Sequence, residues 1–287
     1  MNKLKTFIDL TRLNKPTGFM LLFWPSLWGL TLGNNDFNNI NLYIYYLILF
    51  FLGSVLMRSA GCIINDIIDK DYDKKVKRTK NRPLPSERIS IKESFLYCLA
   101  LCLVAFLILI QFNKLTIFLG IASMSLAFTY PFMKRFTYWP QLFLGITFNY
   151  GLILGWTAIK DQMDITPIIF YLGAIFWTLG YDTIYGYQDI KDDEIIGLKS
   201  TSIKFKNNPH KFLILCYSVF LLNLLITAFF MELSSFFYLT FILIILQMFY
   251  FQLKKLNIKN SFECLTTFKS NNFVGLLVLI SLIGGKV

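Results

Sequence analysis

Charged residues are scarce in this chain of 287 residues: they make up 16% of it, whereas hydrophobic residues make up 55%. Soluble globular proteins carry about 25% charged residues, so this chain has too few to cover a water-soluble surface. Its apolar residues instead gather in blocks of roughly 17 to 22 residues, the length that crosses the hydrocarbon core of a bilayer. The composition argues against an intrinsically disordered chain and a soluble nucleic-acid binder, and it predicts a membrane protein.

The chain also has a single histidine and only five cysteines. His210 is the only histidine, which argues against a His-ligated zinc or haem and against a Ser-His-Asp triad. The five cysteines include no C-x-x-C pair and four of them lie in apolar segments, so we interpret them as buried thiols rather than a disulfide framework. Any chemistry therefore depends on carboxylates, Lys, Arg, Tyr and Asn.

Nine apolar segments predict an all-α, polytopic membrane protein with nine transmembrane helices. They lie near residues 17–34, 41–64, 93–112, 115–132, 138–159, 165–185, 212–231, 233–253 and 271–286. The first carries Pro25 and two tryptophans and lacks a small-residue cleavage site, so we interpret it as a retained helix and not as a removed signal peptide. The last is the shortest of the nine.

Lys and Arg are distributed unevenly between the connections. Of the 28 in the chain, 24 lie in the amino-terminal segment and in alternate connections, three lie on the opposite side, and Arg58 lies within the second segment. Because cytoplasmic loops carry an excess of basic residues, this asymmetry places the amino terminus and the long connections 65–92 and 186–211 in the cytoplasm. The net charge of +11 thus indicates topology, and contact with anionic lipid or a phosphorylated substrate.

The first long connection opens with an acidic cluster, residues 65–73 (NDIIDKDYD). If the second helix continues through it, Asp66, Asp69 and Asp73 share one face and Asp71 points away. Carboxylates stacked in this way repel one another, especially beside a low-dielectric membrane, and a bound cation would remove the repulsion. A solvated acidic helix end is the alternative interpretation.

A second acidic cluster, residues 181–194, places Asp182, Tyr185, Asp189 and Asp193 on one stripe at i, i+3, i+7 and i+11. Asp182 lies within an apolar span, where an ionisable residue is costly and indicates function. Asp189 and Asp193 follow Asp69 and Asp73 by 120 residues each. This offset predicts a single domain, 1–287, with two repeated four-helix halves, about 17–132 and 138–253, plus a ninth helix.

Carboxylates without His or Cys favour a hard cation, and Mg²⁺ commonly joins a few carboxylates to the phosphate oxygens of a substrate. Basic residues that neutralise phosphate follow the first cluster: Lys74, Lys75, Lys77, Arg78, Lys80 and Arg82. The expected ligand is a pyrophosphate. A pyrophosphate substrate for an intramembrane enzyme should carry a long lipid tail, so a polyprenyl diphosphate is the leading candidate.

These residues carry a resemblance to a known family. The motifs are Asn65-Asp66-x-x-Asp69-x-x-x-Asp73, the run KNRPLP at 80–85, the run YPFMKR at 130–135, and Asp182-Thr-Ile-Tyr185 continuing to Asp189-x-x-x-Asp193. Together they resemble the UbiA superfamily of intramembrane prenyltransferases, most closely the branch that prenylates 4-hydroxybenzoate in ubiquinone biosynthesis. Pro85-Ser86-Glu87 departs from the small residue or Gly that the family often has after its Arg-Pro-Leu run.

The resemblance implies helices around a central cavity in a bacterial inner membrane, with both motifs at its cytoplasmic mouth. It implies transfer of a polyprenyl group from polyprenyl diphosphate to the ring carbon ortho to the hydroxyl of 4-hydroxybenzoate, with Mg²⁺ as cofactor. The expected metal ligands are Asp66, Asp69, Asp73, Asp189 and Asp193. The expected catalytic residues are Asp182, Tyr185 and Arg135. The expected substrate-binding residues are Asn65, Arg12, Lys15, Lys80, Arg82, Lys134 and Lys199.

Aromatic side chains are abundant, with 30 Phe, 15 Tyr and 5 Trp, and some should shield an allylic cation from water. The candidates are Phe128, Tyr130, Phe148 and Tyr150. Each is also suited to ordinary packing against lipid or a neighbouring helix.

Three alternatives stay open at this point. A relative that acts in menaquinone synthesis or haem farnesylation would share the metal site. A CDP-alcohol phosphotransferase also has spaced aspartates, but it needs a Gly directly after the second, where this chain has Lys70. A cation-coupled transporter should place its ionisable residues near the bilayer midplane, whereas these acids cluster at one surface.

Overall fold

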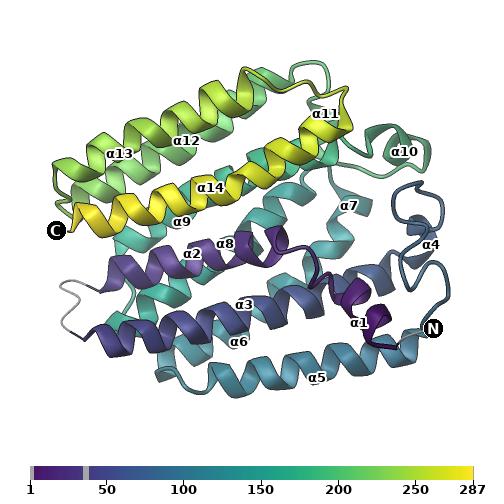
Figure 1. The fold of residues 1–287 in the computed structure, drawn as a ribbon, viewed down its shortest axis with the longest axis horizontal. Coiled ribbons are helices and arrows are strands. Elements are labelled where there is room, and N and C mark those ends of the chain that lie inside the picture. Colours follow the sequence, from purple (N-terminus) through teal and green to yellow (C-terminus); the bar gives the residue numbers. More distant parts are fainter. Residues whose placement is uncertain (1–2, 35–38, 287) are drawn as a thin grey trace.

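The computed structural model describes residues 3–34 and 39–286, and within these ranges it contains helices and no strands (Figure 1). The long helices are α2 (Thr17–Gly33), α3 (Ile40–Ile68), α5 (Ile91–Leu109), α6 (Lys114–Thr129), α8 (Pro140–Lys160), α9 (Ile165–Gly186), α12 (Pro209–Phe230), α13 (Ser235–Ile245), which continues as a π-helical segment η2 (Leu246–Leu253), and α14 (Ser261–Gly285). The short elements are α1 (Lys3–Thr11), α4 (Lys70–Asp73), η1 (Tyr130–Phe132), α7 (Met133–Phe136), α10 (Ile190–Ile195) and α11 (Thr201–Lys204).

Each of the nine predicted apolar segments corresponds to one long helix. In the described part of the chain, eight of these helices are long and apolar enough to cross a membrane. The remaining one, α2, has 17 residues. The all-α, multi-pass prediction is therefore confirmed, with nine as an approximate count of spans.

The predicted start of the last helix, residue 271, was wrong. α14 begins at Ser261 and has 25 residues, so it is one of the longest helices rather than the shortest. The Asn260 side chain caps it by accepting hydrogen bonds from the N–H groups of Phe262 and Glu263. Hydropathy missed residues 261–270 because this part of the helix is polar. The predicted basic loop 254–270 is therefore a short loop that is followed by the first turns of α14.

The most extensive helix packing is of α2 against α8, α8 against α9, and α9 against α12. α2 and α8 approach closely at glycines: a Cβ on Gly29 would lie 1.9 Å from the Leu152 carbonyl oxygen, and one on Gly155 would lie 2.2 Å from the Ser26 carbonyl oxygen. Beside this contact the ring of Trp28 stacks on Phe170. Small residues of this kind let helix backbones approach in membrane proteins.

The ends of the bundle differ. Figure 1 shows α4, α7, α10 and α11 gathered at the right-hand end, where α3 and α9 finish, and the carboxyl terminus at the opposite end. We call the first of these the motif end. On the outside of the bundle, apolar side chains are exposed along α5 and α6, including Leu107 (60%) and Phe118 (68%). Such a surface suits lipid and not water.

Candidate active site

The first aspartate motif lies where α3 ends. α3 finishes at Ile68, the backbone bends at Asp69, and α4 follows directly. Helical hydrogen bonds continue across this bend: the N–H of Asp69 donates to the Asn65 carbonyl (2.9 Å), and the N–H of Asp73 donates to the Asp69 carbonyl (2.8 Å). Asp66, Asp69 and Asp73 are 1%, 2% and 8% exposed, whereas Asp71 is exposed. A bent helix rather than a continuous one therefore buries the three predicted carboxylates and leaves Asp71 outside.

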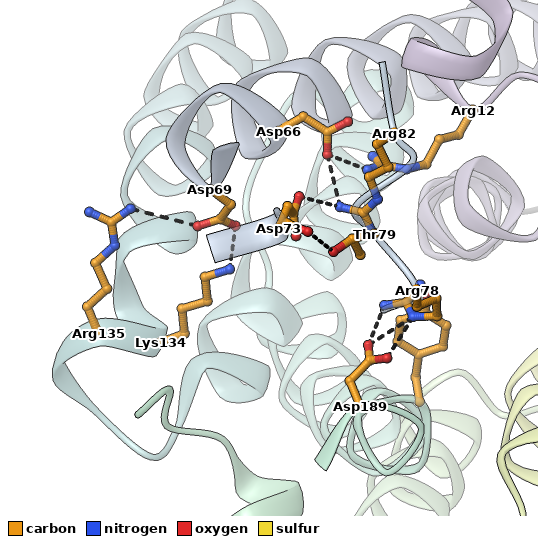
Figure 2. Close-up of polar contacts among 11 residues, drawn as sticks. Arg12, Asp66, Asp69, Asp73, Arg78, Thr79, Arg82, Lys134, Arg135 and Asp189 are labelled. Carbon is orange, nitrogen blue, oxygen red and sulfur yellow. Dashed lines mark hydrogen bonds and ion pairs between the residues drawn. The ribbon is translucent and has the colours of Figure 1, made fainter. Parts of the chain in front are cut away.

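Two arginines compensate the charges of Asp66 and Asp73 (Figure 2). Arg12 Nη2 lies 2.5 Å from Asp66 Oδ1. Arg82 Nη1 lies 3.1 Å from the same oxygen and 2.8 Å from Asp73 Oδ2. Arg12 stands between α1 and α2 with φ 56°, a left-handed conformation that is costly for a residue other than glycine. The contact thus holds a strained turn against the first motif.

The run at 130–135 supplies the partners of Asp69. Lys134 Nζ donates to Asp69 Oδ2, and Arg135 Nη2 lies 3.8 Å from Asp69 Oδ1. Arg135 also donates to the Ile68 carbonyl at 2.8 Å and lies over the ring of Tyr72. Burial raises the pKa of Asp69, and Lys134 opposes that rise.

The second aspartate motif is joined to the first loop by Arg78 (Figure 2). Arg78 Nε donates to both carboxylate oxygens of Asp189 (2.8 and 2.9 Å), and its Nη2 forms an ion pair with the same group. Its Nη1 donates to the Tyr185 hydroxyl at 2.9 Å. The structure therefore brings the two motifs together. Sequence reasoning did not single out Arg78, whose only signal was its place in the basic run.

Asp193 differs from the other four predicted metal ligands, which form ion pairs, because its side chain has no hydrogen bond or ion pair with the described residues. It lies one turn after Asp189, at the start of α10, where the N–H of Asp193 donates to the Asp189 carbonyl. Burial raises the pKa of Asp193 to about 6, and the neighbouring charge of Asp189 adds to the rise. The second motif thus contains an acid without a cation of its own.

The acids carry oxygen atoms of the kind that ligate divalent cations. Asp66 Oδ2 and Asp69 Oδ1 are buried and have no hydrogen-bond partner in the described structure, so their lone pairs are available. Within residues 3–34 and 39–286 no group of three or more His, Cys, Asp or Glu side chains converges into a ready-made metal cage. This arrangement fits Mg²⁺, which commonly uses one or two carboxylates together with waters and substrate phosphates.

An apolar cavity of about 250 Å³ lies further inside the bundle, between α2, α3, α5, α6 and α8. Arg58 and Gly61 of α3 line the cavity, and Gly61 lies within two helical turns of Asp66. Arg58 lies in this wall with its guanidinium 5.4 Å from the centre of the Phe148 ring, and it forms no ion pair or hydrogen bond with the described residues. In the sequence, Arg58 stands out because it lies inside an apolar segment, where burying a cation costs free energy.

Three of the four predicted aromatic candidates line this cavity: Tyr130, Phe148 and Tyr150. Phe128 does not, and 49% of it is exposed. The prediction for Phe128 was wrong because that side of α6 faces away from the bundle. Asp182 is half-buried on α9, and its side chain has no hydrogen bond or ion pair with the described residues. Tyr185, one turn further, contacts Arg78 and the ring of Phe268.

The other predicted substrate-binding residues lie around this end with fewer contacts. Asn65 is half-buried and its side chain has no hydrogen bond with the described residues, and the side chains of Lys15 and Lys80 are exposed. Lys199 Nζ donates to the Phe136 carbonyl at 3.3 Å and lies over the Tyr138 ring. These contacts place Lys199 beside α7 rather than in the aspartate cluster.

The departure at Pro85-Ser86-Glu87 has a local explanation. Glu87 adopts φ 58°, a left-handed conformation that glycine adopts at little cost. Its N–H donates to the Leu84 carbonyl at 3.1 Å, and its carboxylate pairs with Lys74 at 2.8 Å. The loop therefore keeps a turn suited to glycine.

The chain is similar to proteins of one kind over almost its whole length. It is 41% identical over 286 residues to the 4-hydroxybenzoate octaprenyltransferase of Francisella tularensis subsp. novicida, a match that covers 98% of each chain. It is 40% identical over 290 residues to the mitochondrial 4-hydroxybenzoate polyprenyltransferase of Bos taurus, covering 99% of this chain and 76% of that one.

Solved structures share the fold. A UbiA homologue from Aeropyrum pernix K1 has a TM-score of 0.72 and 22% identity over 92% of this chain and 96% of that chain. A UbiA homologue from Archaeoglobus fulgidus bound to GPP and Mg²⁺ has a TM-score of 0.68 and 18% identity over 97% of this chain and 99% of that chain. The UbiA prenyltransferase family itself matches residues 22–277. With that match, and with relatives at 40% identity or more along its length, the chain belongs to the UbiA prenyltransferase family.

Proposed function

We propose that this chain is a Mg²⁺-dependent 4-hydroxybenzoate polyprenyltransferase of ubiquinone biosynthesis. The observation that carries the proposal is the meeting of two aspartate motifs, ringed by Arg and Lys, beside an apolar cavity that contains Arg58. Charges at the mouth suit a diphosphate, and the cavity suits a prenyl chain and an aromatic ring. The printed names of the relatives support this substrate pair.

The donor would bind at the motif end. The five aspartates predicted as metal ligands provide the oxygen atoms, and two of these atoms have no hydrogen-bond partner in the described structure. When bound, Mg²⁺ would stabilise the negative charge that develops on the diphosphate leaving group. Arg78, Arg82 and Lys134 each hold a carboxylate, so their N–H groups are placed to hold phosphate oxygens in the same region.

The acceptor would bind in the cavity. A benzoate carboxylate in an apolar site needs a cation, since an unpaired buried charge costs several kcal/mol. Arg58 lines the cavity without an ion pair, whereas Arg12 and Arg135 lie at Asp66 and Asp69. We therefore favour Arg58 over the other two as the group that holds the acceptor carboxylate.

In the reaction the C–O bond to the diphosphate breaks, a C–C bond forms at the ring carbon ortho to the hydroxyl, and that carbon loses its proton. Tyr130 and Phe148 in the cavity wall would face the allylic cation with π electrons and exclude water. Asp182 and Tyr185 would orient the reacting groups from α9.

We also propose a bacterial inner-membrane location, with the amino terminus and both aspartate motifs in the cytoplasm. The distribution of Lys and Arg supports this orientation, with 24 on the side of the motifs and three on the other.

The test is an acceptor panel. Purified protein in detergent with Mg²⁺ and a polyprenyl diphosphate is offered 4-hydroxybenzoate, a dihydroxynaphthoate or haem, and products are identified by mass spectrometry. A prenylated 4-hydroxybenzoate is the expected product. Exclusive prenylation of the naphthoate or farnesylation of haem would assign the chain to another branch.

A further inference from the structure

A second hollow lies at the motif end, on the outside of the bundle. Its walls are Thr137, Trp139, Leu142 and Phe143 at the start of α8, and Phe176 and Leu179 on α9. We call it the Trp139 groove. It has a volume of about 390 Å³, and all its lining residues except Leu179 are partly exposed. None of them takes part in the aspartate cluster or the central cavity.

The groove lies along the start of α8 and the later part of α9. Trp139 directly precedes α8, and Leu179 lies about two turns before the end of α9. Phe136 and Tyr138, the sequence neighbours of Thr137, are 72% and 43% exposed. Exposed aromatics at a helix end are typical of the level of lipid headgroups. Of the residues that line the groove, Thr137 and the indole N–H of Trp139 supply polar groups, and Leu142, Phe143, Phe176 and Leu179 are apolar.

Two lysines near Trp139 and Tyr138 have no acidic partner among the described residues. Lys204 Nζ lies 4.6 Å from the centre of the Trp139 ring and forms no ion pair with the described residues. Lys199 Nζ lies beside Tyr138 and donates only to a backbone carbonyl. The nearby Glu194 is paired with Lys206 at 2.6 Å. No acidic side chain lines the groove, so this part of the described surface is positively charged.

Lys204 and Trp139 are also held in place. The rings of Phe205 and Phe212 stack with centroids 3.8 Å apart, and Trp139 packs edge-on against both. The Trp139 indole N–H donates to no group in the described structure. The Lys204 ammonium and the Trp139 ring thus lie together against a stacked pair of aromatic rings, and Trp139 itself lines the apolar groove.

We propose that the Trp139 groove binds an anionic glycerophospholipid. One acyl chain would lie along Leu142, Phe143 and Phe176, and the headgroup phosphate would meet Lys204 and the indole N–H. A zwitterionic lipid has the same acyl chains but no net negative charge, so Lys199 and Lys204 should favour the anionic lipid over it. The site is separate from prenyl transfer and does not depend on the function proposed above.

The test is native mass spectrometry of the full chain released from detergent with phosphatidylglycerol or phosphatidylcholine. Wild-type protein should retain phosphatidylglycerol in preference to phosphatidylcholine. Lys204→Ala should weaken phosphatidylglycerol retention about fivefold, the effect of about one interfacial charge, and Lys204→Arg should restore it. Leu142→Trp, which fills the groove, should reduce retention of the lipid with Lys204 intact.

Lys254 provides the matched control, because its Nζ lies 4.7 Å from the Tyr250 ring at the end of η2, and neither Lys254 nor Tyr250 lines the Trp139 groove or the central cavity. Lys254→Ala should leave retention unchanged. Equal retention of both lipids by wild type would overturn the proposal, as would an equal loss in Lys204→Ala and Lys254→Ala, which would indicate general surface charge. A dimer that Leu142→Trp dissociates would also overturn it, because the groove would then hold a second copy of the chain.

Discussion

At the scale of single residues, the acids of the site follow from the sequence but most of their partners do not. The spacing of Asp66, Asp69 and Asp73 predicted which carboxylates turn inward and that Asp71 turns out, because helical periodicity is local. Arg12 reaches Asp66 from 54 residues away and Arg78 reaches Asp189 from 111 away. Contacts of that separation depend on how the helices pack, which no local pattern encodes.

Arg58 gives the first prediction at this scale. If it holds the acceptor carboxylate, Arg58→Gln should lower kcat/KM for 4-hydroxybenzoate about 30- to 1000-fold, from the roughly 2 to 4 kcal/mol of a lost buried charge pair. The KM for the polyprenyl diphosphate should change little. With 4-hydroxybenzamide, which lacks the carboxylate, the variant and wild type should be equally slow. Unchanged kinetics with 4-hydroxybenzoate would remove this role from Arg58.

Asp193 gives a prediction about pH. Its folded-state pKa of about 6 lies above the ordinary value of 3.8, so between these values the folded chain binds a proton that the unfolded chain releases. The ionised group therefore destabilises the fold above about pH 6, and that cost disappears as the pH falls. In EDTA and without diphosphate, lowering the pH from 7.5 to 5.5 should raise the thermal midpoint of wild type more than that of Asp193→Asn. Asp71→Asn should respond as wild type does, and an equal response in all three proteins would contradict the assignment.

At the scale of elements, hydropathy located every long helix but misjudged those with polar segments. α14 begins ten residues earlier than predicted, because its first turns carry Thr, Lys, Ser and Asn. One of these, Asn271, is fully buried and accepts a hydrogen bond from Trp177 Nε1 at 2.8 Å. A polar residue paired inside the bundle is tolerated in a span, yet it lowers the hydropathy from which the span is predicted.

Helix packing gives the next prediction. Gly155→Ala places a Cβ 2.2 Å from the Ser26 carbonyl oxygen and 2.5 Å from the Leu30 nitrogen, so α2 and α8 must move apart. Overpacking of this kind typically costs about 1 to 3 kcal/mol, and the thermal midpoint in detergent should fall. Gly53→Ala is the matched control, because no atom lies within 4 Å of its added Cβ. A midpoint unchanged by Gly155→Ala would show that this contact is not tight.

At the scale of the whole molecule, the topology brings the two motifs to one end. α3 and α9 both finish at the motif end, so residues far apart in sequence meet there (Figure 1). The sequence predicted this meeting from the alternation of spans and from the basic connections. That the two halves descend from a repeated unit stays a prediction.

Orientation is testable with two exposed positions at opposite ends, Lys75 after α4 and Gln162 between α8 and α9. A membrane-impermeant maleimide added to intact bacteria should label Gln162→Cys and leave Lys75→Cys unlabelled until the cells are opened. The unsubstituted chain gives the background, since four of its five cysteines are buried. Labelling of Lys75→Cys in intact cells would reverse the proposed orientation.

The central claim is that buried aspartates of the motif end act with Mg²⁺ in prenyl transfer, and one matched pair tests it most directly. Prenylation of 4-hydroxybenzoate from a polyprenyl diphosphate is measured for wild type, Asp69→Asn and Asp71→Asn, each with Mg²⁺ and with EDTA. Wild type and the exposed-site variant Asp71→Asn should make product with Mg²⁺ and none with EDTA. Asp69→Asn should stay folded and be at least about 100-fold slower, the order expected for lost charge stabilisation of the transition state. Full activity of Asp69→Asn, or turnover in EDTA, would contradict the account.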